Sequence, residues 1–365
     1  MTIRVRLSLD WPANLTPDPL RVALFGWLFA RHHKGVLILN IRGRKPGTPP
    51  PDAHQRIFEQ LHWLGLDWDR APSVDDNPSS QRTVIDDHEM RVTHVFQDEK
   101  HLETTPRYLQ LCRELGWTPP QFVSLPPIDG EPGVSLESYR ARGYLALAIV
   151  NHLARLGWSP KGKRRVLSLA ELATRFELSR LSRRSPPFDP ERLAWFNHRC
   201  IRQLDVETLT PLLIPYWRAS YGIDHRAVGA DLTPTAWRYT LAAALADELR
   251  DLAQASDLAR PFFTDQIAPQ PDAAGALAQP YAPDILRAFI DGLPALDPFA
   301  FDKIDKFITA LRCQFKAAYR IRSRDVMFVI RAALTGQLGG PCLVIACQLI
   351  GRARCIERAQ KALTG

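Results

Sequence analysis

The start of the chain carries the feature that most constrains its fold, a strand–helix–strand pattern. Ile3–Leu9 alternates apolar and polar residues, Leu20–His32 repeats apolar residues at helical spacing, and Val36–Ile41 is a nearly unbroken apolar run. Gly35 stands between the helix and the second strand, at a position where helices commonly end. Such a unit places two parallel strands side by side, so we expect an α/β domain at the beginning of the chain.

The chain changes character near Gly133. Before this point, Val84–Val95 offers further strand material and Thr105–Leu115 a further helix, whereas the residues after it are patterned almost wholly as helices. The segment Ala268–Pro283 is rich in Pro, Ala and Asp, and we expect it to be an internal linker. The sequence therefore predicts an α/β front followed by an all-α back.

Composition limits the class of protein. The chain has 365 residues, 45% of them hydrophobic, so it can bury a substantial core. It has no apolar run of membrane-spanning length and no signal-peptide core at its N-terminus, so we expect a cytoplasmic protein without a membrane partner. The six cysteines form no CxxC pair, and we expect free, buried thiols. A formal net charge of +8 favours a polyanionic partner, with nucleic acid first.

Longer blocks of the sequence resemble a known family. Similar blocks occur in the same order in bacterial glutamyl-tRNA synthetase, and here they read ALFGWLFARHHKGVLIL, LHWLGLDWD, IDDHEMRVTHVFQDEKHL, GYLALAIVNHLARLGWSP and, near the end, VIRAALTG. The chain is therefore identified as a member of this class I aminoacyl-tRNA synthetase family. The resemblance implies a Rossmann-type catalytic domain over residues 1–130, a stem-contact domain over 131–225 and a helical anticodon-binding region over 226–365.

The resemblance also implies where the catalytic motifs should lie, and the first of them is missing. In the family, a strand arginine, here Arg6, precedes a HIGH-type motif that cradles the ATP phosphates at a helix N-terminus. Without gaps, the HIGH-type positions fall on Thr16, Pro17, Asp18 and Pro19. The two prolines lack N–H donors, and Asp18 adds a negative charge. Each lost preorganised donor typically costs about 3 kcal/mol of transition-state stabilisation.

Two further substrate positions depart from the family pattern. Arg42 replaces a glutamate that receives the substrate ammonium in the family. Two like charges about 4 Å apart repel by roughly 4 kcal/mol at an effective dielectric constant near 20. Gln97 replaces an arginine of the substrate pocket. Arg6 is retained, which is compatible either with a surviving carboxylate-binding site or with a structural ion pair.

Two family segments are also missing from the sequence. The KMSKS-type lysine loop should lie between LPPIDG and VSLESYRARGY, where this chain has only Glu131, Pro132 and Gly133. The chain also passes from NPSSQR almost directly into TVIDDHEM, so we expect the insertion that grips the tRNA acceptor end to be deleted around Asn77–Thr83. We therefore assign no catalytic residue, and we expect ATP and Mg²⁺ as cofactors only if activity is retained.

The positions that the resemblance assigns to tRNA contact are better preserved. They are basic residues in a loop, in a stem-contact segment and in VIRAALTG: Lys161, Lys163, Arg164, Arg165, Arg183, Arg184 and Arg331. Arg331 corresponds to an arginine that faces the anticodon in bacterial family members. Each position also has a plainer interpretation, which is solvated surface for the clusters and a helix-capping or ion-pair role for Arg331.

Several possible metal ligands lie close together in the sequence. His88, His94 and His101 follow Asp86 and Asp87, but their spacing matches no tight ligand pattern. We therefore predict structural polar contacts for these residues and no metal site.

The sequence favours a glutamyl-tRNA synthetase-like protein that has lost aminoacylation and acts as a tRNA-binding, regulatory or scaffolding paralogue. The expected partners are tRNA, first the glutamate acceptor, and an active synthetase or a glutamyl-tRNA-using enzyme. The alternatives are a residual ATP-dependent glutamate–tRNA ligase, a repurposed nucleotide-dependent ligase, and a protein-interaction module without RNA.

Overall fold

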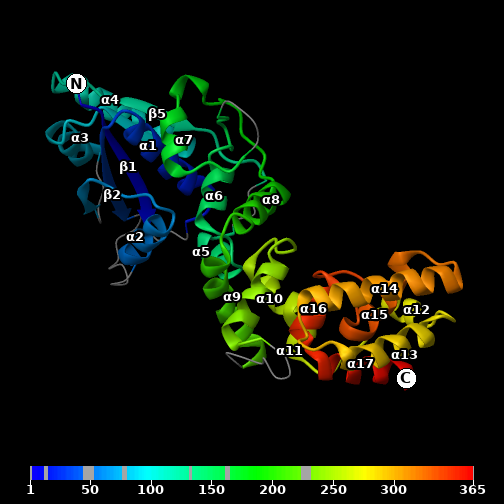
Figure 1. Ribbon diagram of the computed structural model, residues 1–365. Helices are drawn as coiled ribbons and strands as arrows, with labels where there is room; N and C mark the ends of the chain where they lie inside the picture. The colour runs from blue at the N-terminus through cyan, green and yellow to red at the C-terminus, as the bar shows by residue number, and fades with distance from the viewer. Residues whose placement is uncertain are drawn as a thin grey trace. The chain divides into compact units, whose positions relative to one another are not determined.

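The computed structural model describes residues 2–11, 15–43, 53–75, 80–130, 134–160, 165–222 and 232–364. The chain forms two compact units, Met1–Cys200 and Ile201–Gly365 (Figure 1). Within the described residues, no helix combines the length and the apolar character needed to cross a membrane.

A parallel sheet with strand order β3-β2-β1-β4-β5 forms the centre of the first unit. Its strands are β1 (Arg4–Trp11), β2 (Val36–Gly43), β3 (Arg70–Asp75), β4 (His94–Asp98) and β5 (Gln121–Leu125). The predicted strand–helix–strand unit is confirmed, because β1 and β2 are parallel neighbours joined through α1 (Pro17–His32). This strand order is that of a doubly wound α/β domain.

Helices cover both faces of the sheet. Side chains of β1 alternate between the faces, so Val5 and Leu7 are buried in the core with α1 whereas Arg6 lies on the opposite face, where it pairs with Asp87 of α3. The remaining helices of this unit are α2 (Ala53–Trp63), α3 (Ser80–Glu89), α4 (Thr105–Glu114), α5 (Leu136–Ala141), α6 (Ala146–Leu153), α7 (Leu169–Arg175) and α8 (Pro190–Ile201), with 3₁₀ helices η1 (Glu99–Thr104) and η2 (Leu178–Arg180).

The prediction of strand over Val84–Val95 is correct only for its last two residues. Val84 is buried on α3, which continues through Glu89, and the strand β4 begins only at His94. The polar run Asp86–Glu89 explains the difference, because a helix can turn most of these side chains outward whereas a half-buried strand would have to bury every second one.

The second unit is all helical in its described part, as predicted. Its helices are α9 (Val206–Tyr221), α10 (Pro234–Leu245), α11 (Ala255–Phe263), α12 (Pro271–Leu277), α13 (Ala282–Gly292), α14 (Phe301–Tyr319), α15 (Ser323–Thr335), α16 (Leu343–Ile350) and α17 (Arg352–Thr364), with 3₁₀ helices η3 (Leu252–Gln254) and η4 (Leu293–Ala295).

The expected linker Ala268–Pro283 is wrong as well. It contains α12 and the start of α13, and α12 packs against α15. Pro271 occupies the first turn of α12, where its missing N–H costs nothing, and alanine is the best helix former. The backbone before α12 is also fixed, since Gln270 donates its N–H to the Gly336 carbonyl at 2.8 Å.

The six cysteines are free, as predicted, but only four of them are buried. Cys313 and Cys342 are exposed, which corrects the expectation of uniformly buried thiols. Burial raises the pKa of the Cys200 thiol to about 12, so this thiol is protonated and unreactive at neutral pH.

Candidate functional site

The N-terminus of α1 is the position at which the resemblance places phosphate binding. Thr16 precedes the helix in an extended conformation, and its side chain makes no capping hydrogen bond. Pro17 and Pro19 carry no N–H, so Asp18 supplies the only N–H among the first three helical residues. The N–H of Leu20 is already bonded to the Thr16 carbonyl at 3.3 Å. This helix start therefore offers few donors to an anion.

The Asp18 carboxylate binds other parts of the protein. Its Oδ1 accepts the backbone N–H of Ile128 at 3.0 Å and pairs with Arg21 Nη2 at 3.3 Å. Arg21 is only 1% exposed, and it also donates to the carbonyls of Leu156, at 3.2 Å, and of Pro126. The start of α1 is thereby connected to the segment that follows β5 and to the end of α6.

These residues do not fit the phosphates of ATP. A triphosphate at the HIGH-type positions would lie beside the negative charge of Asp18, and it would compete with that carboxylate for the Ile128 N–H and for Arg21. Like charges about 4 Å apart repel by roughly 4 kcal/mol at an effective dielectric constant near 20. The carboxylate also complements the positive end of the helix dipole without any ligand.

Arg6 lies in a buried ion pair. Its Nε is 2.7 Å from Asp87 Oδ1, with both side chains almost fully buried, and its Nη1 donates to Ser8 Oγ. Tyr108 donates its hydroxyl to the other oxygen of Asp87 at 2.8 Å. Burial, together with the nearby Asp87 charge, raises the pKa of Tyr108 well above its usual value. Of the two interpretations left open by the sequence, this geometry is that of a structural ion pair.

The other two substrate positions are Gln97 and Arg42, and the structure describes the side chain of Gln97 but not that of Arg42. Gln97 on β4 donates from Nε2 to Thr105 Oγ1 at 3.1 Å and to Ser124 Oγ at 3.2 Å, so its amide is used in fixing β4 to its neighbours. The backbone of Arg42 lies in β2 beside Asp10 of β1. The side chain of Arg42 lies outside the described residues, as do Glu131, Pro132 and Gly133, which stand where a KMSKS-type loop would be.

The histidines considered as metal ligands make separate contacts. His88 stacks on Trp117 with ring centroids 3.8 Å apart, and His94 packs against Phe29. Burial lowers the pKa of His94, which favours its neutral form. Among the described residues, no group of three or more His, Cys, Asp or Glu side chains is placed to hold a metal ion.

Three residues of the predicted basic surface are described in the first unit. Arg165 pairs with Glu171 at 2.7 Å. Arg183 and Arg184 are exposed and make no ion pair with the residues that the structure describes, and the Arg184 N–H is bonded to Ser182 Oγ at 3.1 Å. Lys161, Lys163 and Arg164 lie outside the described residues.

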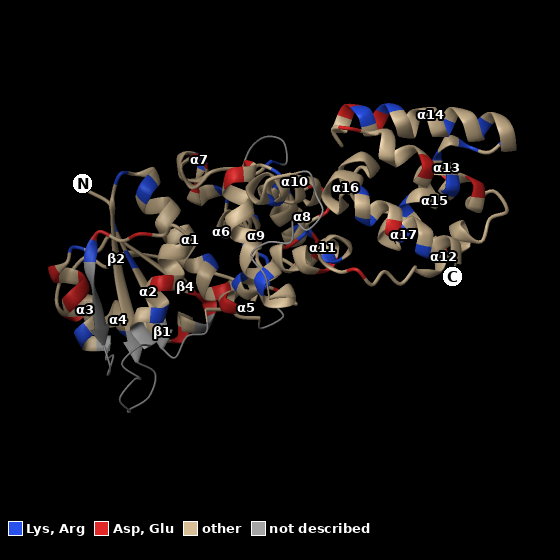
Figure 2. Cartoon of the chain, turned by 60° about the horizontal axis from the view of Figure 1, so that its bottom comes forward, with Lys and Arg blue, Asp and Glu red and all other residues tan. Residues whose placement is uncertain are grey.

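Basic and acidic side chains alternate on the longest helix of the second unit. Figure 2 shows Lys and Arg interspersed with Asp and Glu on α14, which carries Asp302, Lys303, Asp305 and Lys306 in its first turns. Farther along, the charged residues of α14 are the basic Arg312 and Lys316, so acidic side chains offset the basic ones only in its first turns.

Arg331 is largely buried on α15, with 7% of its surface exposed. Its Nη1 donates to the Gly339 carbonyl at 3.3 Å, and burial lowers the pKa of its guanidinium. The side chain therefore supports the loop that joins α15 to α16. A direct contact with RNA at this position would require that loop to move.

The sequence alone did not identify the residues that pair with Arg6 and Asp18 in the structure. A structural polar contact was predicted for Asp87, but its partner, Arg6, was not identified. Arg21 was not singled out, although its spacing of three from Asp18 on a predicted helix is a recognisable ion-pair signal. The bond from Ile128 to Asp18 spans 110 positions and leaves no local sequence signal.

Family models match both units of the chain. The catalytic domain of class I tRNA synthetases (E and Q) matches residues 19–83 and 80–195, and an anticodon-binding domain matches residues 208–363. The two catalytic pieces meet near Asn77–Thr83, in agreement with a deletion there. The fold and these matches place the chain among the class I tRNA synthetases (E and Q) as a family.

Comparison with individual relatives identifies the family within this class. The chain is 35% identical to the glutamate–tRNA ligase of Geobacillus stearothermophilus over 293 residues, covering 77% of this chain but 58% of the relative. It is 27% identical to the ligase of Thermosynechococcus vestitus, covering 96% of each. The chain belongs to the glutamate–tRNA ligase family. It spans about 58% of the length of the first of these relatives.

A solved structure confirms the fold prediction. A glutamate tRNA ligase from Elizabethkingia meningosepticum, crystallised in complex with its amino acid, matches with a TM-score of 0.84 over 100% of this chain and 99% of that chain, at 18% sequence identity. The predicted architecture, a class I synthetase catalytic domain followed by a helical anticodon-binding region, is confirmed.

Proposed function

We propose that this chain is a glutamate–tRNA ligase relative that does not activate an amino acid and instead binds tRNA as a regulatory or scaffolding protein. The observation that carries the proposal is the bond from the Asp18 carboxylate to the Ile128 N–H, at the point where ATP phosphates would have to lie. Loss of activation follows, because aminoacylation by this family begins with ATP.

The substrate positions support the same conclusion. Arg6 is paired with Asp87, so its charge is already balanced within the protein. Gln97 provides a neutral amide where the family has an arginine, and that amide is bonded to Thr105 and Ser124. A substrate carboxylate would therefore find no free cation at these two positions, because Arg6 is paired and Gln97 is neutral.

The RNA part of the proposal has separate support. The anticodon-binding match covers residues 208–363, almost the whole second unit. Arg183 and Arg184 are exposed, without carboxylate partners in the described part of the chain, in a segment that resembles a stem contact. Phosphate contacts by such arginines supply affinity without sequence specificity, so specificity would have to come from the second unit. The tRNA that accepts glutamate is the first candidate.

ATP–pyrophosphate exchange tests the loss of activation. We expect no exchange with glutamate or with any other amino acid, with or without total tRNA, under conditions in which the Geobacillus stearothermophilus ligase is active. Exchange with any amino acid would overturn the proposal, and it would establish ATP and Mg²⁺ as cofactors of a residual or repurposed ligase.

Recovery of RNA tests the second part. The protein is purified from its own cells at low salt, and the RNA that co-elutes is sequenced. Enrichment of one tRNA, with affinity that falls steeply as salt rises, is the expected result. Absence of enriched RNA together with a bound protein would overturn tRNA binding and would support a protein-interaction module.

A further inference from the structure

The second unit contains a cavity of about 460 Å³ that the proposed function does not use. It lies between α12, α15, α17 and the segment that connects α11 to α12. Five alanines line it, four on the three helices and one directly after α12: Ala274, Ala278, Ala332, Ala333 and Ala362. Protein interiors are normally close-packed, so small side chains converging from three helices leave space that larger residues would fill.

The remaining apolar walls come from Ile267, Pro269 and Leu277. The volume lies within the usual range of small-molecule sites, roughly 300–1,000 Å³, and such sites combine apolar walls with a few polar groups. The polar groups here are Asp265, Arg358 and Lys361. Their state of pairing determines which ligand the cavity can accept.

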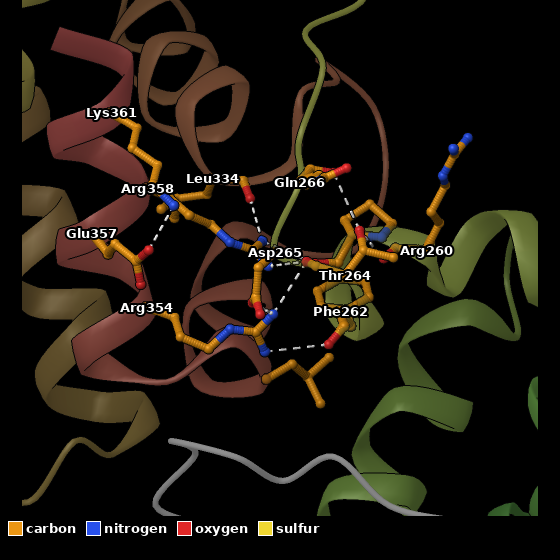
Figure 3. Close-up of polar contacts among 12 residues, drawn as sticks. Arg260, Phe262, Thr264, Asp265, Gln266, Leu334, Arg354, Glu357, Arg358 and Lys361 are labelled. Atoms are coloured by element: carbon orange, nitrogen blue, oxygen red, sulfur yellow. Dashed lines mark hydrogen bonds and ion pairs between the residues drawn. The ribbon is translucent and has the colours of Figure 1, made fainter. Parts of the chain in front are cut away.

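Arg358 is a buried cation in the wall of the cavity, with 4% of its surface exposed. Its Nη1 donates to the carbonyls of Pro261, at 2.8 Å, and Leu334, at 2.6 Å, and its Nη2 donates to the Thr264 carbonyl at 2.7 Å (Figure 3). These acceptors are all neutral. Burial and the adjacent Arg354 lower the pKa of Arg358 to about 10, so the guanidinium is charged at neutral pH.

The neighbouring carboxylates are paired with other cations. Asp265 Oδ1 lies 2.5 Å from Arg354 Nη2, and Glu357 Oε1 lies 2.6 Å from Lys361 Nζ (Figure 3). Among the described residues, Arg358 therefore makes no direct bond to a carboxylate, although the nearby charges of Asp265 and Glu357 oppose the lowering of its pKa. A buried charge without a direct counterion favours an anion placed beside it.

The hydrogen-bonding capacity of Arg358 limits the size of that anion. A guanidinium has five N–H donors, and three are used in the bonds to carbonyls. One donor on Nη2 is left for a ligand, because Nε is enclosed by the protein, without a hydrogen-bond partner. A single charge-assisted hydrogen bond from Nη2 is enough to hold one oxygen of a carboxylate. A phosphate dianion would need more donors than this one.

We propose that this cavity binds a small amphiphilic carboxylate, with its apolar body against the alanines and its carboxylate on Arg358. The apolar walls favour burial of a short aliphatic or aromatic body, and the buried guanidinium selects a monoanion over an alcohol or an amine. The proposal is independent of tRNA binding, because it concerns a different set of residues from those discussed above.

Isothermal titration calorimetry of the full chain tests the proposal with three probes of equal chain length: octanoate, octan-1-ol and octylamine. We expect octanoate to bind at least about tenfold more tightly than octan-1-ol, and octylamine to bind least. Equal affinities for octanoate and octan-1-ol, or no binding of octanoate at about 1 mM, would overturn the assignment of a carboxylate site.

Two matched variants locate the binding. Ala278→Leu fills the cavity from the exposed residue that directly follows α12, whereas Ala276→Leu adds the same side chain on α12 but outside the cavity lining. We expect the first variant to weaken octanoate binding by at least about tenfold and the second to change it by less than about twofold. Equal effects of the two variants would place the binding elsewhere and overturn the proposal. Circular dichroism of both variants controls for folding.

Discussion

The Asp18 carboxylate accepts the backbone N–H of Ile128 at 3.0 Å, and the same oxygen pairs with the buried Arg21. Asp18 therefore occupies an N–H and an arginine that a phosphate would need. It also connects the start of α1 to the segment after β5. The scaffold behind the altered loop keeps its stability because α1 is buried along nearly its whole length. Packing of its buried side chains stabilises α1, and the contacts of Asp18 stabilise the first turn of that helix.

Asp18→Ala should destabilise the protein by about 1–3 kcal/mol, because it leaves the Arg21 guanidinium and the Ile128 N–H without their carboxylate partner. Urea unfolding followed by circular dichroism measures the loss. Asp302→Ala is the matched control, since Asp302 is an exposed aspartate in the first turn of α14. We expect the control to cost less than about 0.5 kcal/mol, and an equal cost for both variants would contradict a structural role for Asp18.

His152 should make the stability of the protein depend on pH. It is buried on α6 against Phe188, and neither ring nitrogen has a hydrogen-bond partner among the described residues. Burial lowers the pKa of His152 to about 4 from its ordinary 6.5, and Arg192 contributes. The unfolded chain therefore binds the proton more tightly. The stabilisation from the neutral ring is complete above pH 6.5 and is lost as pH falls toward 4, by about 2 kcal/mol between about pH 7.5 and about pH 5.

The variant His152→Leu isolates this contribution, because leucine does not titrate. Its free energy of unfolding should fall by about 2 kcal/mol less than that of the wild type between about pH 7.5 and about pH 5. His62→Leu, at an exposed position on α2, is the control and should leave the pH dependence unchanged. If His152→Leu and the wild type lose the same stability on acidification, the buried ring is not the titrating group.

Much of the fold could be predicted from sequence, because its signals are local. The apolar run of β2 and the helical period of α1 both depend on residues close in sequence, and the structure contains both elements. The two wrong elements have local causes as well. A polar run within α3 was taken for strand, and a proline at the first turn of α12 was taken for a break.

Of the candidate site, only the absence of the family's motif residues could be predicted from the sequence. Missing motif residues can be counted in the sequence, but the new partners of the retained residues come from distant segments. Arg6 finds Asp87 across 81 positions, and Arg358 finds the Pro261 carbonyl across 97. Backbone carbonyls carry no side-chain signature, so the role of Arg358 is visible only in three dimensions.

The hydrogen bond from Tyr108 to Asp87 should contribute measurably to stability. Tyr108→Phe removes only the hydroxyl and should cost about 1–2 kcal/mol, whereas Asp87→Asn breaks the buried ion pair and should cost about 3–5 kcal/mol. Urea unfolding measures both. Tyr239→Phe is the control, because the Tyr239 hydroxyl makes no hydrogen bond in the described part of the chain. A larger loss for Tyr108→Phe than for Asp87→Asn would contradict the central role of the carboxylate.

The raised pKa of Tyr108 adds a consequence at alkaline pH. The folded protein holds the phenolic proton more tightly than the unfolded chain does, so this contribution is complete below about pH 10 and is lost as pH rises further. Tyr108→Phe should therefore reduce the alkaline loss of stability. Unfolding curves at neutral and alkaline pH, compared between Tyr108→Phe and Tyr239→Phe, measure the difference. Parallel losses in the two variants would show that another group titrates.

Arg183 and Arg184 should contribute to RNA affinity through phosphate contacts. Each is exposed and has no carboxylate partner among the described residues, so neutralising either one removes a charge without breaking an ion pair described there. Arg183→Gln and Arg184→Gln should each weaken tRNA binding and reduce the slope of log affinity against log salt by about 1. Arg107→Gln, an exposed arginine on α4, removes the same charge elsewhere and should leave the slope unchanged. A filter-binding series over salt concentration measures all three variants. Equal slopes in all of them would mean that general charge, rather than contact at this segment, carries the binding.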